Sequence, residues 1–306
     1  MANEVRRVGL VGAGAMGEPM GQMLLKRGFA VTTTAHRNRG PVERLESAGA
    51  TVVASPKEVA AAADVVVVCV PDAPQVEAVT LGPDAIEAGG RPGLVVIDMS
   101  TIAPTATLRI GAVLREHGIE MIDAPVSGGP TRAATGDLTI MVGGPAETVE
   151  RCRPVLEAMG SKVIHVGALG QGEVVKLVNN TILGVLMTVL GEALTMGVKA
   201  GADIHTMREV IMNSAGANYL LDKWIVPTVL QDQYSGGFAT ELMHKDLGAA
   251  LQTARDIGVA MPTAALVQQF YRLIMSEHAR DDYSAVTLLN QEAANISIAT
   301  GKPRTP

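Results

Sequence analysis

The sequence predicts an α/β fold, in which a doubly wound N-terminal domain is followed by an all-α C-terminal domain. Strand and helix patterns alternate through the first half of the 306-residue chain, and strand patterns end near residue 166, after which only long helical segments follow. We place the domains at residues 1–166 and 167–300, joined by one long helix over about 170–200. Two domains are natural for a chain of this length.

The predicted strands of the first half are short and apolar. Residues 65–70 have no polar side chain on either face, which is typical of a parallel sheet covered by helices on both sides. A predicted helix over 16–27 ends at Gly28, a residue type suited to a helix stop. The other predicted strands are residues 5–11, 30–34, 51–53, 94–97 and 119–122. This alternation predicts a Rossmann-type sheet.

The second half consists of predicted helices. The one over 170–200 is apolar around most of its circumference, so we expect it to be buried on several sides. Its stretch 174–198 is the best candidate for a membrane span. It includes Lys176, Asn180 and Glu192, however, so a buried helix explains it better and no membrane partner is expected. The remaining predicted helices cover residues 203–213, 240–257, 262–277 and 284–294.

Composition and charge exclude several classes of protein. With 47% hydrophobic and 18% charged residues, the chain is not disordered. Its net charge of −6 and the lack of long basic runs make a nucleic-acid surface improbable. Cys69 and Cys152 show no metal or redox spacing, and the first residues contain no hydrophobic signal core. We therefore expect a cytoplasmic protein with reduced thiols and no metal site.

A glycine motif follows the first predicted strand. Residues 12–17, GAGAMG, match G-x-G-x-x-G, which alone is weak evidence because small residues also form ordinary tight turns. Here the motif opens a helix within a strand–helix–strand unit, which is the context that dinucleotide binding requires. Gly12 permits the turn, Gly14 lets the backbone approach a pyrophosphate, and Gly17 allows close packing. Ala15 and Met16 begin the helix, whose N–H groups suit phosphates.

The end of the second predicted strand bears on the choice of cofactor. Residues 34–39 read TAHRNR, so no carboxylate is present to bind an adenine ribose 2′-hydroxyl. His36, Arg37 and Arg39 could instead pair with a 2′-phosphate, for which arginine geometry is well suited. The alternative is that these are solvated loop residues. The sequence therefore favours NADP(H) over NAD(H).

The segment DAPVSGG, residues 123–129, directly follows a predicted strand. Ligands of doubly wound sheets bind outside the carboxyl ends of the strands. Ser127 offers a hydroxyl group, and Gly128 and Gly129 can present N–H groups to an anion. On residue spacing alone, a simple turn without a ligand explains this segment equally well.

The segment GEVVKLVNN, residues 172–180, places three notable residues on one helix face. Gly172, Lys176 and Asn180 are spaced i, i+4 and i+8. A lysine flanked by valine and leucine on an apolar helix must be paired, snorkelling or functional. Burial would lower the pKa of Lys176 toward the range useful for proton transfer.

Together these segments resemble the β-hydroxyacid dehydrogenase family, which includes 3-hydroxyisobutyrate dehydrogenase and the semialdehyde and tartronate semialdehyde reductases. The matching segments are GAGAMGEPM, DMSTIAPT, DAPVSGG, GEVVKLVNN and HKDLGAAL, in that order and across nearly the whole chain. Many relatives carry Asp or Asn, then Arg, after the second strand. Ala35 and His36 stand there in this chain, which leaves the cofactor choice open.

The resemblance implies an oxidoreductase that transfers a hydride between a nicotinamide cofactor and a small β-hydroxy acid or its semialdehyde. It implies that Lys176 is the general acid/base and that Asn180 contacts both the substrate and this lysine. Implied cofactor contacts are Val70, Pro71, Lys245 and, between nicotinamide and substrate, Thr101. Implied substrate contacts are Ser127, Gly128, Gly129, Phe238 and Asp246. Arg132 could pair with a second charged group of the substrate, although a position on the solvated surface is the favoured interpretation.

Two other functions and the oligomeric state remain as expectations. An NADPH-dependent imine reductase has the same general architecture but usually lacks the lysine. A non-catalytic NADP-binding protein is the other alternative, and Lys176 argues against both. In the family that the chain resembles, the helical domain interlocks between subunits. The very apolar residues 183–194 would suit such an interface, so we expect a homodimer or homotetramer.

Overall fold

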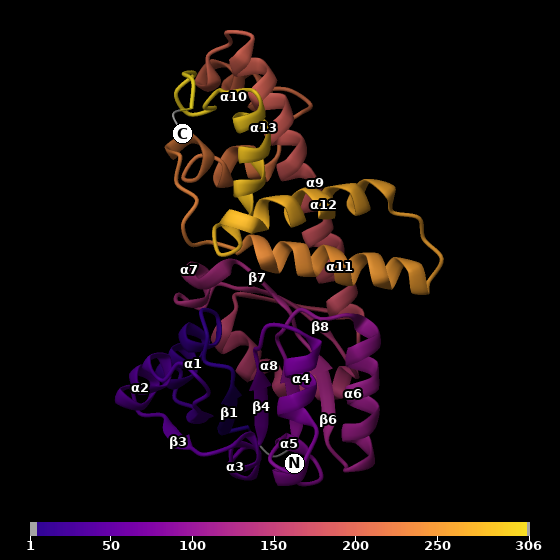
Figure 1. The fold of residues 1–306 in the computed structure, drawn as a ribbon. Helices are drawn as coiled ribbons and strands as arrows, with labels where there is room; N and C mark the ends of the chain where they lie inside the picture. Colours follow the sequence, from indigo (N-terminus) through magenta and orange to yellow (C-terminus); the bar gives the residue numbers. More distant parts are fainter. Residues whose placement is uncertain (1–4, 305–306) are drawn as a thin grey trace. The chain divides into compact units, whose positions relative to one another are not determined.

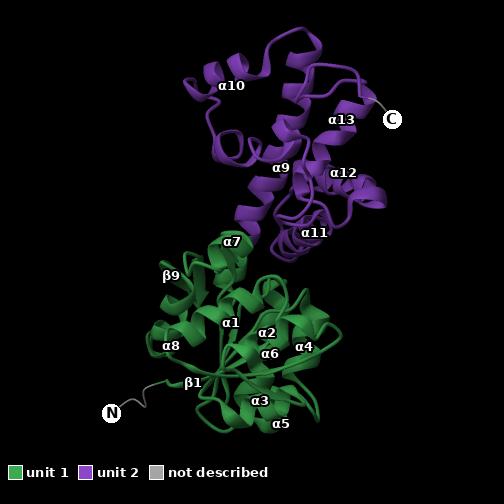
Figure 2. Ribbon diagram, turned by 90° about the vertical axis from the view of Figure 1, so that its left-hand side faces the viewer, with its two compact units in different colours: residues 1–176 green, residues 177–306 purple. Residues whose placement is uncertain are grey.

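The computed structural model describes residues 5–304 and divides the chain into two compact units. One unit ends at Lys176 and the other begins at Leu177 (Figure 2). This division lies within the long helix α9 (Gln171–Lys199). The domains predicted at 1–166 and 167–300 instead meet just before that helix. The first turn of α9 therefore belongs structurally to the N-terminal unit.

The first unit contains a sheet (Figure 1). Its six N-terminal strands are parallel and have the order β3-β2-β1-β4-β5-β6. This is the strand order of a doubly wound dinucleotide-binding sheet and confirms the predicted fold class. The six strands are β1 (Arg7–Val11), β2 (Ala30–Thr34), β3 (Thr51–Val53), β4 (Val65–Val68), β5 (Val95–Asp98) and β6 (Glu120–Asp123).

The far edge of the sheet differs from the prediction. Three further strands extend it, namely β7 (Val126–Ser127), β8 (Thr139–Gly143) and β9 (Lys162–Gly167). The sequence did not predict these three strands, and β8 runs antiparallel to β6 and β7, unlike the parallel pairs among the first six strands. β7 has only two residues, and β9 contains exposed polar positions such as Lys162 and His165. Neither has the continuous apolar run that marks a buried parallel strand.

Helices cover both faces of the sheet. In β4 all four valines are fully buried, and alternate residues point to opposite faces. Val65 and Val67 join one core cluster, and Val66 and Val68 join the other. The covering helices are α1 (Gly17–Lys26), α2 (Gly40–Ser47), α3 (Pro56–Ala62), α4 (Ala73–Thr80), α5 (Ile86–Gly89), α6 (Pro104–Glu116), α7 (Gly129–Ala133) and α8 (Ala146–Met159).

Helices are the regular elements of the second unit's described part, and none of its residues belongs to a strand of the sheet, as predicted. After α9 come α10 (Ile204–Met212), α11 (Thr240–Asp256), α12 (Pro262–His278) and α13 (Leu288–Ala293). The helix expected over 284–294 is split into a 3-10 turn, Tyr283–Thr287, and the short α13. The Asp282 side chain caps this turn by accepting the Ser284 N–H, and every residue of the turn is buried.

Helix α9 has one buried and one exposed apolar side. Met187, Leu190, Leu194 and Val198 belong to the core of the second unit. The exposed apolar stripe consists of Val178, Ile182, Val189 and Met196, which are 49–70% exposed. Within residues 5–304, α9 is also the one helix long and apolar enough to cross a membrane by length and composition. Core helices of soluble proteins pass the same test. The expected burial on several sides is therefore incomplete in the single chain.

Candidate active site

The candidate residues of the first unit lie at the carboxyl edge of its parallel strands. β1, β4, β5 and β6 are neighbours that run in the same direction, so the loops that follow them emerge side by side. This is the edge where doubly wound sheets bind ligands. The loops contain residues 12–17 after β1, Val70 and Pro71 after β4, Thr101 after β5, and residues 124–129 after β6.

The three glycines of the motif after β1 are explained by different physical constraints. Gly12 has a φ of +101°, and a Cβ there would overlap the carbonyl oxygen of Cys69. A Cβ on Gly17 would overlap the carbonyl oxygen of Gly12. Gly14 is exposed, and a Cβ there would meet nothing within 4 Å. The packing of the protein explains Gly12 and Gly17, whereas the open backbone at Gly14 fits the close approach of a ligand such as a pyrophosphate.

The start of α1 adds N–H groups to this loop. Met16 is the N-cap residue of α1, and its side chain makes no capping hydrogen bond. Helix N-termini bind anions because their first N–H groups lack partners within the helix. Ala15 and Met16 therefore lie where the phosphates of a dinucleotide would be expected.

We expect Gly14→Ala to separate cofactor binding from folding. Since Gly14 has open space around it and no positive φ, the unfolding free energy should change by less than about 0.5 kcal/mol. The dinucleotide Kd should rise at least tenfold, or about 1.4 kcal/mol, because a methyl group would obstruct the pyrophosphate. Titration calorimetry and chemical denaturation measure both. The control is Gly17→Ala, which should lose stability; unchanged cofactor affinity in Gly14→Ala would contradict the assignment.

The basic residues after β2 are exposed. His36, Arg37 and Arg39 lie in solvent between β2 and α2. Arg39 is 3.8 Å from Glu43 on the next helical turn, which is a weak surface ion pair. The side chains of His36 and Arg37 are therefore accessible to a ligand at the edge of the sheet next to the glycine motif.

A hydrogen bond joins the loops after β4 and β5, and a second one orders the loop after β5. The Val70 N–H donates to Ser100 Oγ at 3.1 Å, and the Ser100 N–H donates to Asp98 Oδ1 at 3.0 Å. Ser100 and Asp98 are both buried. Thr101 follows directly and is half-buried. The two loops that are predicted to cover the cofactor therefore form one hydrogen-bonded structure.

Asp123, at the end of β6, has a role that the sequence did not reveal. Its carboxylate is fully buried and accepts the N–H groups of Gly170 at 2.7 Å and Glu173 at 2.8 Å. Burial raises the pKa of Asp123, and the backbone N–H donors oppose that shift. Asp123 thereby holds the first turn of α9 against β6.

Gly172 makes that contact possible. A Cβ there would lie 2.5 Å from the carbonyl oxygen of Met141 and 2.8 Å from Asp123 Oδ2. The space that Gly172 leaves is thus filled by the protein itself.

The candidate substrate contacts follow β6. Ser127 ends β7, and Gly128 and Gly129 follow with φ values of +138° and +67°. These three candidate substrate contacts lie on the same chain segment as Asp123.

Lys176 and Asn180 lie one turn apart on α9, and both are buried, at 9% and 2% exposure. In the second unit the Asn180 amide donates to Asp246 Oδ2 at 2.6 Å, and Lys245 Nζ is 3.0 Å from Asp246 Oδ1. The structure therefore brings Asn180, Lys245 and Asp246 into one cluster. Asn179 also donates to Asn180 Oδ1 at 3.0 Å, so both ends of the Asn180 amide are oriented.

Phe238 belongs to a separate cluster of the second unit. Its N–H donates to Asp282 Oδ2 at 3.0 Å, and its ring lies 5.9 Å from that of Tyr283. Asp282 is buried and also accepts the Trp224 indole N–H at 2.9 Å. The sequence did not indicate Asp282, because its partners come from distant segments.

Arg132, a candidate contact for a second substrate charge, lies at the surface of the first unit and pairs with Asp137 at 3.0 Å.

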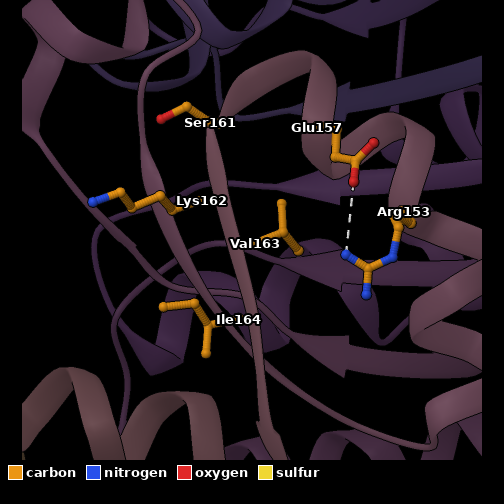
Figure 3. Close-up of a pocket in the computed structure, with 7 residues that line it drawn as sticks. Arg153, Glu157, Ser161, Lys162, Val163 and Ile164 are labelled. Carbon is orange, nitrogen blue, oxygen red and sulfur yellow. Dashed lines mark ion pairs between the residues drawn. The ribbon is translucent and has the colours of Figure 1, made fainter.

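A hollow of about 560 Å³ on the first unit contains none of the predicted residues (Figure 3). It lies between α8 and β9, where Arg153 forms an ion pair with Glu157 at 3.7 Å. It is open to solvent and includes three charged side chains in its lining, unlike the enclosed sites of small ligands. Among residues 5–304, no group of three or more His, Cys, Asp or Glu side chains is arranged to hold a metal ion.

Comparisons with known proteins find family matches over most of both units. Residues 7–167 match the family described as the NAD binding domain of 6-phosphogluconate dehydrogenase. Residues 170–289 match the NAD-binding region of NADP-dependent 3-hydroxyisobutyrate dehydrogenase.

Individual relatives are similar in sequence to this chain over nearly their full length. The NAD-dependent L-serine dehydrogenase of Pseudomonas aeruginosa is 39% identical, over 93% of this chain and 98% of that protein. The 2-(hydroxymethyl)glutarate dehydrogenase of Eubacterium barkeri is 37% identical, over 97% and 98%. A solved 3-hydroxyisobutyrate dehydrogenase of Mycobacterium tuberculosis with L-serine has a TM-score of 0.86 at 32% identity, over 93% and 98%. The chain therefore belongs to the β-hydroxyacid dehydrogenase family and has a nicotinamide-cofactor domain.

Proposed function

We propose that this protein is a dehydrogenase that exchanges a hydride between a nicotinamide cofactor and a small β-hydroxy acid or its semialdehyde. The observation that carries the proposal is the buried Lys176, one helical turn from an Asn180 amide that Asp246 orients. The names of the relatives support it. L-Serine, 3-hydroxyisobutyrate and 2-(hydroxymethyl)glutarate all carry a hydroxymethyl group on the carbon that bears a carboxylate.

The proposed chemistry assigns the proton to Lys176. In oxidation, neutral Lys176 accepts the substrate hydroxyl proton at Nζ; in reduction, its ammonium group returns that proton to the carbonyl oxygen. The positive charge also stabilises the developing alkoxide. Ser127 and the N–H groups of Gly128 and Gly129 hold the substrate carboxylate. The bound nicotinamide supplies or accepts the hydride.

A nicotinamide absorbance assay tests the proposal. Oxidation of 3-hydroxyisobutyrate, L-serine, L-threonate and 2-(hydroxymethyl)glutarate is measured with both cofactors. In the reverse direction, the assay measures reduction of the corresponding semialdehydes or keto acids and of glyoxylate. We expect turnover with at least one of these acids. Tight cofactor binding without turnover on any of them would favour an imine substrate or a non-catalytic protein.

We propose further that NADP(H) is the preferred cofactor. The exposed His36 and Arg37 after β2, together with the lack of a carboxylate on residues 34–39, support this preference. The double variant His36→Ala, Arg37→Ala should raise the Kd of NADPH at least tenfold and leave that of NADH within about threefold. The control Arg115→Ala removes an exposed charge elsewhere in the same unit. A wild-type Kd for NADH at or below that for NADPH would contradict the proposal.

We also propose a homodimer or homotetramer in which a second copy covers the exposed apolar stripe of α9. Four large apolar side chains in line on one helix are typical of an interface. Ile182→Glu should shift the protein toward monomers in light scattering, because a charge would be buried in the interface. Leu108→Glu, at an exposed position of α6, is the control. A monomeric wild-type protein at micromolar concentration would rule the assembly out.

A further inference from the structure

Glu173 is a fully buried carboxylate on the first turn of α9, and both its side chain and its backbone are bound. Its Oε2 accepts the Ile102 N–H at 3.2 Å, in the loop after β5. Its own N–H donates to Asp123 Oδ2 at 2.8 Å, at the end of β6. One residue of α9 therefore joins the ends of two neighbouring strands.

These contacts connect the predicted cofactor loops to the predicted acid/base. Ile102 directly follows Thr101, and Glu173 lies one turn before Lys176 on α9. The Val70 N–H bond to Ser100 Oγ continues the connection to the loop after β4. All of these residues belong to the first unit, so the connection lies within one compact part of the chain.

A buried carboxylate at this place needs an explanation. Taking a charged or polar group out of water is costly unless hydrogen bonds compensate, and a helix N-terminus offsets only part of that cost. Asp123 alone already caps the turn through the N–H groups of Gly170 and Glu173. The Glu173 side chain adds the bond that fixes α9 to the loop carrying Thr101.

We propose that Glu173 is a positioning residue that sets the distance between Lys176 and the nicotinamide side of the site at Thr101. This inference rests on the proposed role of Lys176. Displacement of a reacting group by about 1 Å can cost about 10²-fold in rate, so a side chain that touches no substrate can still control kcat.

The experiment compares three replacements of Glu173. Gln retains an oxygen that accepts the Ile102 N–H, Leu fills the volume without an acceptor, and Ala removes both. We expect Leu and Ala to lower kcat at least tenfold, with KM and the cofactor Kd within about threefold of wild type. Gln should restore kcat to within about threefold. Gln171→Ala, exposed on the same turn, is the matched control.

Amide hydrogen exchange provides a readout that does not depend on turnover. The Ile102 N–H should be protected in the wild type and in Glu173→Gln, and should exchange at least tenfold faster in Glu173→Leu. An Ile102 amide that is unprotected in the wild type would overturn the proposal without any variant. So would wild-type kcat in folded Glu173→Leu. If Lys176→Ala retains kcat, the proposed function fails instead, whatever the Glu173 variants do.

Discussion

Replacing Lys176 with alanine is expected to lower kcat at least 10²-fold while the cofactor Kd stays within about threefold. The proposed reaction requires a group that accepts the hydroxyl proton in one direction and donates it in the other, and acid–base catalysis contributes about 10²–10⁴-fold. Lys176 lies on α9 and the glycine motif lies between β1 and α1, so we expect the motif to keep its shape in this variant. Steady-state kinetics and titration calorimetry measure the two quantities.

A second replacement distinguishes the proton from the charge. Lys176→Arg keeps the positive charge, but a guanidinium group does not release its proton at neutral pH. We therefore expect oxidation of the hydroxy acid to remain impaired in this variant. Lys199→Ala, at the exposed end of the same helix, is the matched control and should retain full activity. If Lys176→Ala turned over at near the wild-type kcat, Lys176 would not be the acid/base.

Gly172→Ala should destabilise the protein by about 3 kcal/mol and also reduce kcat. In most helices this change is stabilising, because alanine has the higher helix propensity. Here the added Cβ would lie 2.5 Å from the Met141 carbonyl oxygen and 2.8 Å from Asp123 Oδ2. Relief of that overlap requires α9 or Asp123 to move, and overpacking of this kind costs about 1–3 kcal/mol or more. The movement also displaces Lys176, one turn further along.

The chain provides a direct comparison for this prediction. Gly248 lies inside α11, and a Cβ there would meet only the end of the flexible Gln268 side chain, at 2.9 Å. Gly248→Ala should therefore be neutral or stabilising in chemical denaturation. If both variants had the same stability, the close approach of α9 to Asp123 would not constrain Gly172.

The parallel strands could be predicted because each has a local signature. The four valines of β4 are apolar on both faces, and the glycine motif follows a strand and opens a helix. β7 and β9 lack such a signature, since one is two residues long and the other is largely exposed. Their pairing with β8 is a tertiary contact that no periodicity marks.

The buried carboxylates were not recognised for a related reason. Asp123, Glu173 and Asp282 bind backbone or indole N–H groups that are 47, 71 and 58 residues away in the sequence. Nothing in the neighbouring residues shows that such donors will arrive. The lysine and the asparagine of α9 could be singled out because their surroundings are apolar along the helix itself.

The packing of Gly12 and Gly17 has a consequence for the kinetics of cofactor binding. Both positions are filled by the protein's own backbone, so the loop after β1 has its shape before any dinucleotide arrives. A pre-organised loop loses little conformational entropy on association, and binding does not wait for it to rearrange. Variants at this edge should therefore change the residence time of the dinucleotide far more than its association rate.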